Sequence, residues 1–205
     1  MRKLVVSEFV SLDGVVEAPG GEDGYVHGGW TIPYWCEEIG AFKTAELEAA
    51  DALLLGRVSY EGFAAAWPER VGDPFSDKMN SVAKYVVSAS LRDPSWNNTH
   101  LLGGDMVPAV TALKESDGGD ILVAGSATLV RSLIEADLVD ELRLALYPLT
   151  LGTEKRLFPA SSHVHFEPTT VSTTPTGVIL ASYRRTTAPT EVAFDYKEMA
   201  KRLDG

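Results

Sequence analysis

Three segments of this chain carry small, hydroxyl-bearing and basic residues in an order that suits the binding of an anion. Each follows a short hydrophobic run, and together they are Gly56-Arg57-Val58-Ser59, Ser88-Ala89-Ser90 and Gly125-Ser126. Glycine lets a backbone approach a ligand closely, a guanidinium offers a fork of donors to phosphate oxygens, and hydroxyls add hydrogen bonds. The pattern predicts a phosphate-binding site assembled from three separate turns.

Each segment also has a purely structural interpretation. Gly-Arg after a strand is commonly a turn with a solvated arginine, Ser-Ala-Ser is commonly a turn, and Gly-Ser is commonly a helix cap. The joint occurrence of the three after consecutive hydrophobic runs favours the functional interpretation. The G-x-G-x-x-G fingerprint of Rossmann dinucleotide sites is absent, and Gly20-Gly21 and Gly28-Gly29 fall in a predicted loop instead.

Two other groups of reactive side chains indicate less. His163 and His165 have the period-two spacing that places both imidazoles on one strand face, but no third ligand candidate is near them in sequence, so we expect a solvated face and no metal. Cys36 is the single cysteine, which excludes an internal disulfide and fits a reducing compartment. It has no histidine at motif spacing, and we expect a buried thiol.

The elements that must position the three turns read as strands alternating with helices. Hydrophobic runs bounded by turn residues predict strands at 4–6, 52–55, 85–87, 121–123, 142–146 and 177–183. Helical spacing of apolar residues predicts helices at 34–49, 59–66, 105–115 and 126–136. This alternation favours an α/β domain with largely parallel central strands, because parallel neighbours need a crossover connection.

The end of the predicted sheet differs from its centre. Val164–Val171 and Val178–Tyr183 flank the short turn Pro175-Thr176-Gly177, which predicts an antiparallel hairpin. In an open sheet of this kind ligands bind beyond the carboxyl ends of the strands, where helix N-termini offer free amides. All three candidate turns are expected at that edge.

Length and charge set limits on function. The chain has 205 residues and a net charge of −11, with 45% hydrophobic residues, so it is globular and its surface argues against nucleic acid or an anionic membrane as the main partner. No signal segment or membrane span is predicted, and we expect a cytoplasmic protein. A Pro/Thr-rich stretch at 186–190 predicts a domain at 1–187 and a tail at 188–205 that could be helical.

An ordered set of motifs resembles the dihydrofolate reductase-like fold, specifically the reductase domain of the bifunctional riboflavin-biosynthesis protein. Besides the segments above, the motifs are Ser11-Leu12-Asp13-Gly14, Gly118-Gly119-Asp120-Ile121, Leu138 to Leu144, Tyr147 to Gly152 and Arg156-Leu157-Phe158. The resemblance runs from about residue 3 to residue 185. It implies a three-layer α/β fold with a mixed, mostly parallel central sheet, helices on both faces and a C-terminal antiparallel hairpin.

By this resemblance the cofactor is NADPH. Gly56, Arg57 and Ser59 would approach its adenosine and diphosphate end, and the turn Ser88-Ala89-Ser90 would hold the 2′-phosphate together with Arg57. The pyrophosphate would lie on the remaining segment, which comprises Gly125, Ser126, Ala127, Thr128 and Leu129. Dihydrofolate reductases carry paired glycines where this chain has Gly125-Ser126, so we do not extend their special peptide geometry to this chain.

The substrate side follows from the same resemblance. Asp13 and Gly14 would line the cleft near the nicotinamide, with Asp13 a candidate catalytic residue. Matching the pair Phe42-Lys43 puts the acidic substrate-binding and catalytic role on Glu38, as a half-buried carboxylate of raised pKa; an exposed acidic helix face is the alternative. Trp30 would supply a flat apolar wall, although aromatic residues are more often part of a core.

The sequence thus favours an NADPH-dependent reductase of a pterin or of a ribosylaminopyrimidine of riboflavin biosynthesis. A zinc deaminase domain is excluded by the single cysteine. The alternatives are a cofactor-binding module or sensor with little turnover and, less well supported, a structural protein. The resemblance and the apolar residues of the tail also lead us to expect a homodimer.

Overall fold

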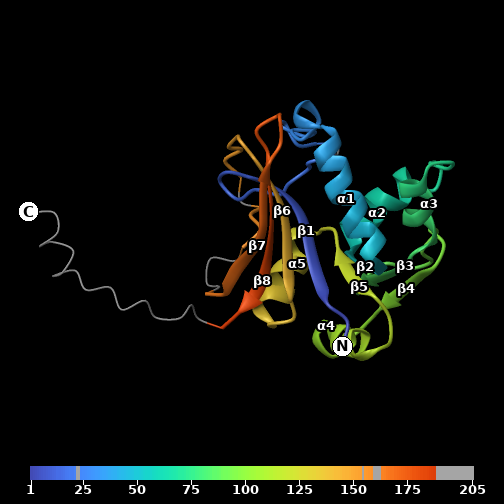
Figure 1. Ribbon diagram of the computed structural model, residues 1–205. Coiled ribbons are helices and arrows are strands. Elements are labelled where there is room, and N and C mark those ends of the chain that lie inside the picture. The colour runs from blue at the N-terminus through green and yellow to red at the C-terminus, as the bar shows by residue number, and fades with distance from the viewer. Residues whose placement is uncertain (22–23, 154, 159–162, 188–205) are drawn as a thin grey trace, which may run out of the picture.

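The computed structural model describes residues 1–21, 24–153, 155–158 and 163–187, and it contains a single mixed sheet with helices on both faces (Figure 1). Its strands are β1 (Leu4–Ser11), β2 (Ala50–Gly56), β3 (Ala83–Val87), β4 (Thr99–Leu102), β5 (Asp120–Val123), β6 (Glu141–Tyr147), β7 (His165–Thr173) and β8 (Ile179–Thr186). Its helices are η1 (Ile32–Tyr34), α1 (Glu37–Ala49), α2 (Arg57–Ala66), α3 (Pro74–Ser81), α4 (Met106–Glu115) and α5 (Ala127–Glu135). The predicted α/β class is confirmed.

The strand order β4-β3-β2-β5-β1-β6-β8-β7 determines where the connections run. Strands β1 to β6 are parallel, whereas β8 is antiparallel to β6 and β7 is antiparallel to β8, which confirms the predicted hairpin. The crossover after β1 leads to β2 on one side, and the crossover after β5 leads to β6 on the other. The neighbours β5 and β1 therefore form the point at which the connections diverge, the place where open α/β sheets bind ligands.

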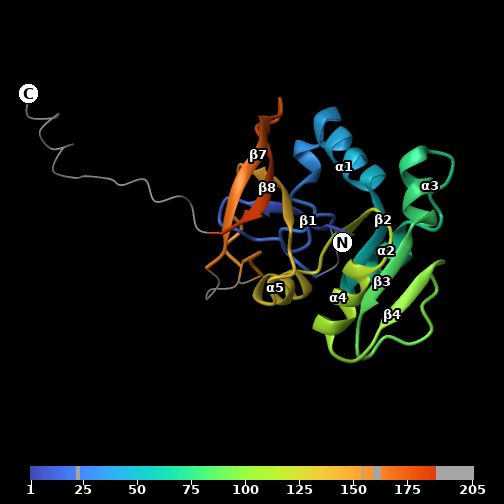
Figure 2. The ribbon, with the colours of Figure 1, turned by 60° about the horizontal axis from the view of Figure 1, so that its bottom comes forward.

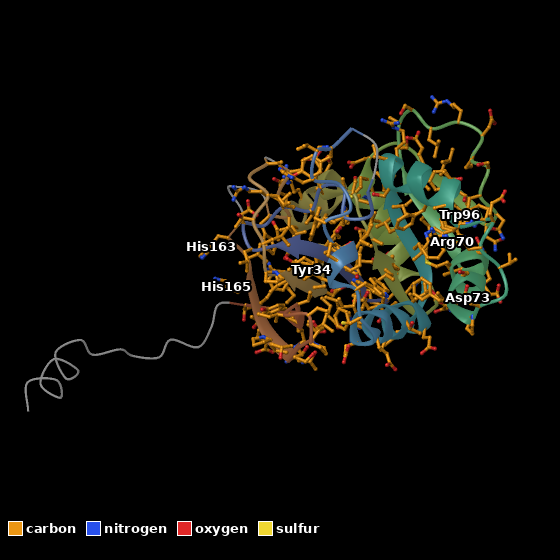
Figure 3. All side chains as sticks on the ribbon, turned by 90° about the horizontal axis from the view of Figure 1, so that it is seen from above. Tyr34, Arg70, Asp73, Trp96, His163 and His165 are labelled. Atoms are coloured by element: carbon orange, nitrogen blue, oxygen red, sulfur yellow. The ribbon has the colours of Figure 1, made fainter. Side chains whose placement is uncertain are left out.

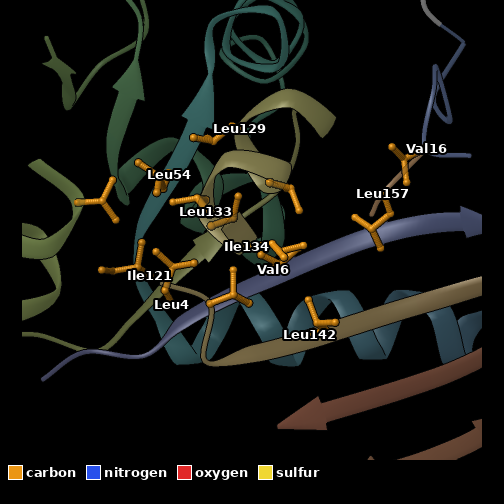
Figure 4. Close-up of a cluster of buried hydrophobic side chains, with 14 of the residues drawn as sticks. Leu4, Val6, Val16, Leu54, Ile121, Leu129, Leu133, Ile134, Leu142 and Leu157 are labelled. Carbon is orange, nitrogen blue, oxygen red and sulfur yellow. The ribbon is translucent and has the colours of Figure 1, made fainter. Parts of the chain in front are cut away.

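Two apolar clusters hold the helices to the two faces. One packs α4 and α5 on the sheet around Leu4, Leu54, Ile121 and Leu133, as Figure 4 shows in close-up. The other joins α1, α2 and α3 to the opposite face. Figure 2 shows α1 and α3 on one side of the sheet and α4 and α5 on the other. The result is the three-layer arrangement that the resemblance implied.

Local sequence explains the central elements. Strand β2 has the composition Ala-Asp-Ala-Leu-Leu-Leu-Gly and is buried on both faces, as expected of a parallel strand covered by helices. Helix α5 buries Leu129, Val130, Leu133 and Ile134, whose spacing forms one apolar stripe. Among the helices that the structure describes, none combines the length and the apolar character that crossing a membrane requires.

Three sequence-based expectations were wrong or incomplete. The helix expected over 34–49 is divided into η1 and α1, because Trp35 and Cys36 between them adopt an extended backbone. Helix α3 was not predicted, since its eight residues are mostly polar. Strand β4 was also missed, because it lies at the sheet edge and is largely exposed. The expected tail at 188–205 lies outside the described residues.

Candidate functional site

The sheet brings the three predicted turns to one edge. Strand β2 pairs in parallel with both β3 and β5, with Gly56 opposite Val87 and Leu54 opposite Val123. Because parallel strands end at the same edge, the segments after β2, β3 and β5 leave the sheet side by side. This arrangement agrees with the expected common location of the three turns.

Two of these turns interlock through their glycines. A Cβ added to Gly56 would lie 2.4 Å from Ser126 Oγ, and a Cβ added to Gly125 would lie 2.5 Å from Ser59 Oγ. Gly125 also has a φ of +74°, in the region that favours glycine. The peptide bond between Gly125 and Ser126 is cis, a geometry that we had not carried over from the resemblance. A Cβ at either position would displace the facing serine hydroxyl, and at position 125 it would also strain the backbone.

The interlocked turns open two helices whose first amides are left uncapped by side chains. Gly56 is the N-cap of α2 and Ser126 is the N-cap of α5, and neither makes a side-chain capping hydrogen bond. By contrast, Asp73 and Asp105 cap α3 and α4 with their carboxylates. Unpaired first-turn amides and the helix dipole together favour an anion. Two such helix ends at adjoining turns together offer the backbone amides that a diphosphate requires.

The side chains of the predicted phosphate site already have partners within the fold. Arg57 lies at the start of α2 and its Nη1 donates to both oxygens of Glu61, at 2.9 and 3.1 Å. Ser88 Oγ accepts hydrogen bonds from the backbone nitrogens of Ser90 and Leu91. Its hydroxyl proton stays available, and Arg57 is 45% exposed. The turn interpretation is therefore correct for Ser88, and it leaves both residues able to contact a ligand.

Asp13 fastens the end of β1 to the segment after β6. Its carboxylate accepts hydrogen bonds from Ser11 Oγ at 2.6 Å and from the backbone nitrogens of Leu151 and Gly152. These donors, led by Ser11, lower the pKa of Asp13 to about 2. Gly14 follows with a φ of +82°, as a tight turn requires. An ionised carboxylate held this way suits positioning better than proton donation.

Two substrate-side residues have environments that differ from the expected ones. Glu38 is exposed on the first turn of α1, so the half-buried carboxylate expected there is absent. Trp30 is only 6% exposed, because its indole donates to the Glu17 carbonyl and packs edge-on against Tyr147. That tryptophan belongs to the core and presents no open wall. Cys36, expected to be buried, is partly exposed at the start of α1.

A buried carboxylate that sequence reasoning passed over lies at the centre of the site edge. Glu8 on β1 is 8% exposed, and its Oε1 accepts a hydrogen bond from Gly125 N at 2.9 Å. Desolvation raises the pKa of Glu8 to about 7, with Lys43 opposing the shift. The available signal was a carboxylate in the run Leu4–Val10, which apart from Ser7 is otherwise apolar. Burying a carboxylate in a central strand costs free energy unless it is paired or hydrogen-bonded, so its presence there calls for an explanation.

The charged neighbours of Glu8 come from α1. Lys43 Nζ donates to Ser7 Oγ at 2.5 Å and to Glu46 Oε2 at 3.3 Å, and Ser7 donates to the same oxygen at 2.6 Å. Lys43 also lies 4.5 Å from the ring centroid of Phe9. The other oxygen of Glu46 is buried without a partner in the structure's described part. Within this network the ammonium group of Lys43 offsets part of the negative charge of Glu46 and Glu8.

The histidine pair stays apart from this edge. The rings of His163 and His165 lie 4.8 Å apart, and Figure 3 shows both on the side of the molecule remote from Asp73 and Trp96. Among the described residues, no group of three or more histidine, cysteine, aspartate or glutamate side chains could hold a metal ion. His165 begins β7, which β8, β6 and β1 separate from β5 in the sheet, so the pair lies away from the three turns.

Comparison with known proteins agrees with this architecture. A model of the RibD C-terminal domain matches residues 2–180. The uncharacterized proteins YyaP and YwjB of Bacillus subtilis strain 168 are each 30% identical, over 77% of this chain and over 80% and 83% of their own lengths. These relatives align over most of the domain described above.

Solved structures show the same fold at lower identity. A Shewanella sp. PV-4 protein assigned to riboflavin biosynthesis has a TM-score of 0.71 and 19% identity, covering 90% of this chain and 99% of that one. A pyrimidine reductase-like protein of Corynebacterium diphtheriae gives 0.66 and 13%, covering 91% and 93%. Enterococcus faecalis dihydrofolate reductase, complexed with NADP(H), gives 0.59 and 15%, covering 90% and 97%.

The fold is dihydrofolate reductase-like, with a mixed sheet that ends in a C-terminal antiparallel pair. Within that fold class, the chain belongs to the RibD C-terminal domain family. The family resemblance predicted from the sequence is confirmed.

We predict that Glu8→Gln stabilises the protein at alkaline pH. The pKa of Glu8 rises from 4.5 to about 7 on folding, so the folded state binds more protons and loses stability as the pH increases through that interval. Gln removes the charge and keeps an oxygen for Gly125 N. The free energy of unfolding in urea should exceed that of the wild type by about 1–3 kcal/mol at pH 8 and converge with it near pH 4.5. A variant less stable than the wild type at pH 8 would contradict the assigned environment.

We predict the opposite pH dependence for Asp13→Asn. Folding lowers the pKa of Asp13 from 3.8 to about 2, so the carboxylate stabilises the fold above pH 4 and loses that contribution as the pH falls toward 2. The variant should lose about 1–2 kcal/mol at pH 7, and the loss should shrink in acid. Urea unfolding at both pH values measures it, with the exposed Asp117→Asn as control. If both variants had the same free energy of unfolding at both pH values, the hydrogen bonds of the Asp13 carboxylate would not stabilise the fold.

Proposed function

We propose that the protein is an NADPH-dependent reductase of a small heterocyclic substrate of the pterin or ribosylaminopyrimidine type. The family supports the reductase class. The observation that carries the cofactor proposal is the interlocking of the Gly56 and Gly125 turns, which opens two helices without side-chain caps at one strand edge. Backbone amides and small residues at adjoining helix ends are the donor set that a dinucleotide diphosphate needs.

The residues present fit the phosphates of such a cofactor. In this proposal the pyrophosphate binds along Gly125, Ser126 and the first-turn amides of α5, namely those of Ala127, Thr128 and Leu129. Gly56 and Ser59 lie across from that turn and border the diphosphate. Arg57 and the turn Ser88-Ala89-Ser90 hold the 2′-phosphate, because the exposed guanidinium can exchange Glu61 for a phosphate with equally good geometry.

The cofactor, when bound, supplies a hydride. The protein's residues bind and orient the two reactants, and they supply the proton that accompanies the reduction. Asp13 and Gly14, just after β1, and Glu38, on the first turn of α1, remain our candidates for substrate contacts, with Asp13 as a positioning group. Trp30 is no longer one of them, because it is buried in the core. A phosphoribosyl substrate would need a further basic contact, for which exposed Arg156 beside Lys155 is the local candidate.

The competing proposal is a cofactor-binding module with little turnover. The exposure of Glu38 favours it to the extent that Glu38 was the expected proton donor. Both proposals require NADPH binding at the same residues, and they separate only when candidate substrates are offered. Oxidation of NADPH by either substrate class supports the reductase; tight binding without oxidation supports the module.

We predict that Arg57→Ala weakens NADPH binding and leaves NADH binding nearly unchanged. The loss of one or two charge-assisted hydrogen bonds to a 2′-phosphate should cost about 1.5–3 kcal/mol, or roughly 10- to 150-fold in Kd. Titration calorimetry of the purified protein with each nucleotide measures both affinities.

Arg184→Ala is the matched control for Arg57→Ala. Arg184 is also exposed and paired with a carboxylate, that of Glu167, but it lies on β8. This variant should bind NADPH as the wild type does. Equal weakening of NADPH and NADH by Arg57→Ala would show that the arginine does not recognise the 2′-phosphate, and absence of binding by the wild type would overturn the proposal.

We also propose that the chain forms a homodimer through the edge strand β7. The resemblance implies pairing through a sheet edge, and β7 lies at the edge of the sheet formed by the described strands, with Val171 exposed. Unprotected edges are a liability that pairing removes. Sedimentation equilibrium should give about 44 kDa, twice 22.1 kDa, and Val171→Lys should shift the mass toward the monomer. A single 22.1 kDa species in the wild type would contradict the dimer.

A further inference from the structure

Glu8 lies where β1 loses its neighbour on one side. Strands β1 and β5 pair from Leu4 to Val6, after which β5 ends and its chain turns toward α5. On its other side β1 stays paired with β6 as far as Ser11. Glu8 therefore lies two residues beyond Val6, the last residue of β1 that pairs with β5, at the divergence of the two crossovers. The hydrogen bond from Gly125 N to Glu8 Oε1 joins β1 to the turn after β5.

Three elements near Glu8 contribute apolar side chains, and a fourth, α1, contributes charged ones. Strand β6 places Leu144 opposite Glu8, β5 ends in Val123, and α5 turns an apolar stripe toward the sheet. The charged side chains that act on Glu8 are Lys43 and Glu46, both on α1. Among the described residues, the hydrogen bond that the structure shows to this carboxyl is the one from Gly125 N to Oε1, which leaves Oε2 as the oxygen proposed to face a reactant.

We propose that Glu8 is the catalytic residue that holds a proton beside the nicotinamide and gives it to the substrate during reduction. This inference rests on the proposed function, because it takes the Gly125 turn as part of the cofactor site. A dinucleotide whose diphosphate lies on that turn can place its ring at the divergence of the crossovers. Burial keeps the carboxyl protonated to an unusual extent near neutral pH, which is the state a general acid needs.

The proposed step balances in atoms and charge. Reduction of a C=N or C=O bond adds a hydride to carbon, supplied by the reduced nicotinamide, and one proton to the heteroatom. Glu8 breaks its O–H bond to supply that proton and becomes a carboxylate beside an oxidised, positively charged ring. After the products leave, the carboxylate takes a proton from water. The resulting carboxylate is stabilised by the opposite charge of the ring while both are present.

The test measures proton linkage to cofactor binding and needs no substrate. NADP⁺ and NADPH are titrated by calorimetry between pH 6 and 8, in two buffers of different ionisation enthalpy. The positive ring of NADP⁺ favours ionised Glu8, so NADP⁺ should release more protons on binding than NADPH does, and its affinity relative to that of NADPH should rise about fivefold to tenfold over this range. The 2′-phosphate, whose second pKa is about 6, titrates in both nucleotides and cancels in this comparison. In Glu8→Gln the ratio of the two affinities should be independent of pH, and both nucleotides should release the same number of protons.

Glu141→Gln serves as the matched control, because Glu141 is a partly buried carboxylate on the neighbouring strand β6 at the opposite end. In this variant the affinities for NADP⁺ and NADPH should depend on pH as they do in the wild type. Unchanged linkage in Glu8→Gln would overturn the role of Glu8 while leaving the cofactor proposal intact. If a folded Glu8→Gln variant bound neither nucleotide, Glu8 would have a structural role in positioning the Gly125 turn, and the proton-donor proposal would be overturned. No binding by the wild type would overturn both proposals.

Discussion

The divergence of the two crossovers between β5 and β1 is the constraint on which the rest of the site depends. Because β1 connects to β2 and β5 connects to β6, the chain turns in opposite directions after neighbouring strands. The turn after β5 must then pass close to the turn after β2, and glycines at positions 56 and 125 make that approach possible. The same divergence leaves Glu8 without a neighbour on the β5 side and within reach of Gly125 N. The proposed anion site and the buried carboxyl are two consequences of one topology.

Electrostatics at this edge is local and does not follow the charge of the whole protein. The chain carries a net charge of −11, which opposes the approach of any phosphate. The proposed phosphate sites therefore depend on backbone amides, two helix dipoles and the one guanidinium of Arg57, all of which act at short range. The 370 Å³ hollow at the other end of the sheet is lined instead by both basic and acidic side chains, among them Arg2, Asp140 and Arg185. Short-range donors explain how an acidic protein could still select a phosphorylated cofactor.

Much of the fold could be predicted from the sequence, and the reasons are visible in particular elements. The apolar run of β2 and the stripe of α5 are strong signals because both are buried in the final structure. Strand β4 and helix α3 have weak patterns because one is an exposed edge and the other is short and polar. The positions of the three turns after β2, β3 and β5 were predicted correctly, since they directly follow recognisable strands, while their phosphate contacts stay a prediction. Glu8 was not, because its meaning depends on β5 ending two residues earlier in the sheet register, which no local pattern encodes. The prediction that Glu38 is half-buried was wrong, because one short matching pair cannot establish which face of α1 is buried.

The central claim is that a pyridine dinucleotide binds where β2 and β5 end. Amide NMR spectra of the wild-type protein, recorded during a titration with NADPH, test it most directly. The account predicts that the largest shift changes fall on the first-turn amides of α2 and α5, on Gly125 and on the Ser88 turn, with a smaller change at Glu8. Changes confined to other surfaces, such as the hollow lined by Arg2 and Arg185, or no changes at saturating nucleotide, would contradict it.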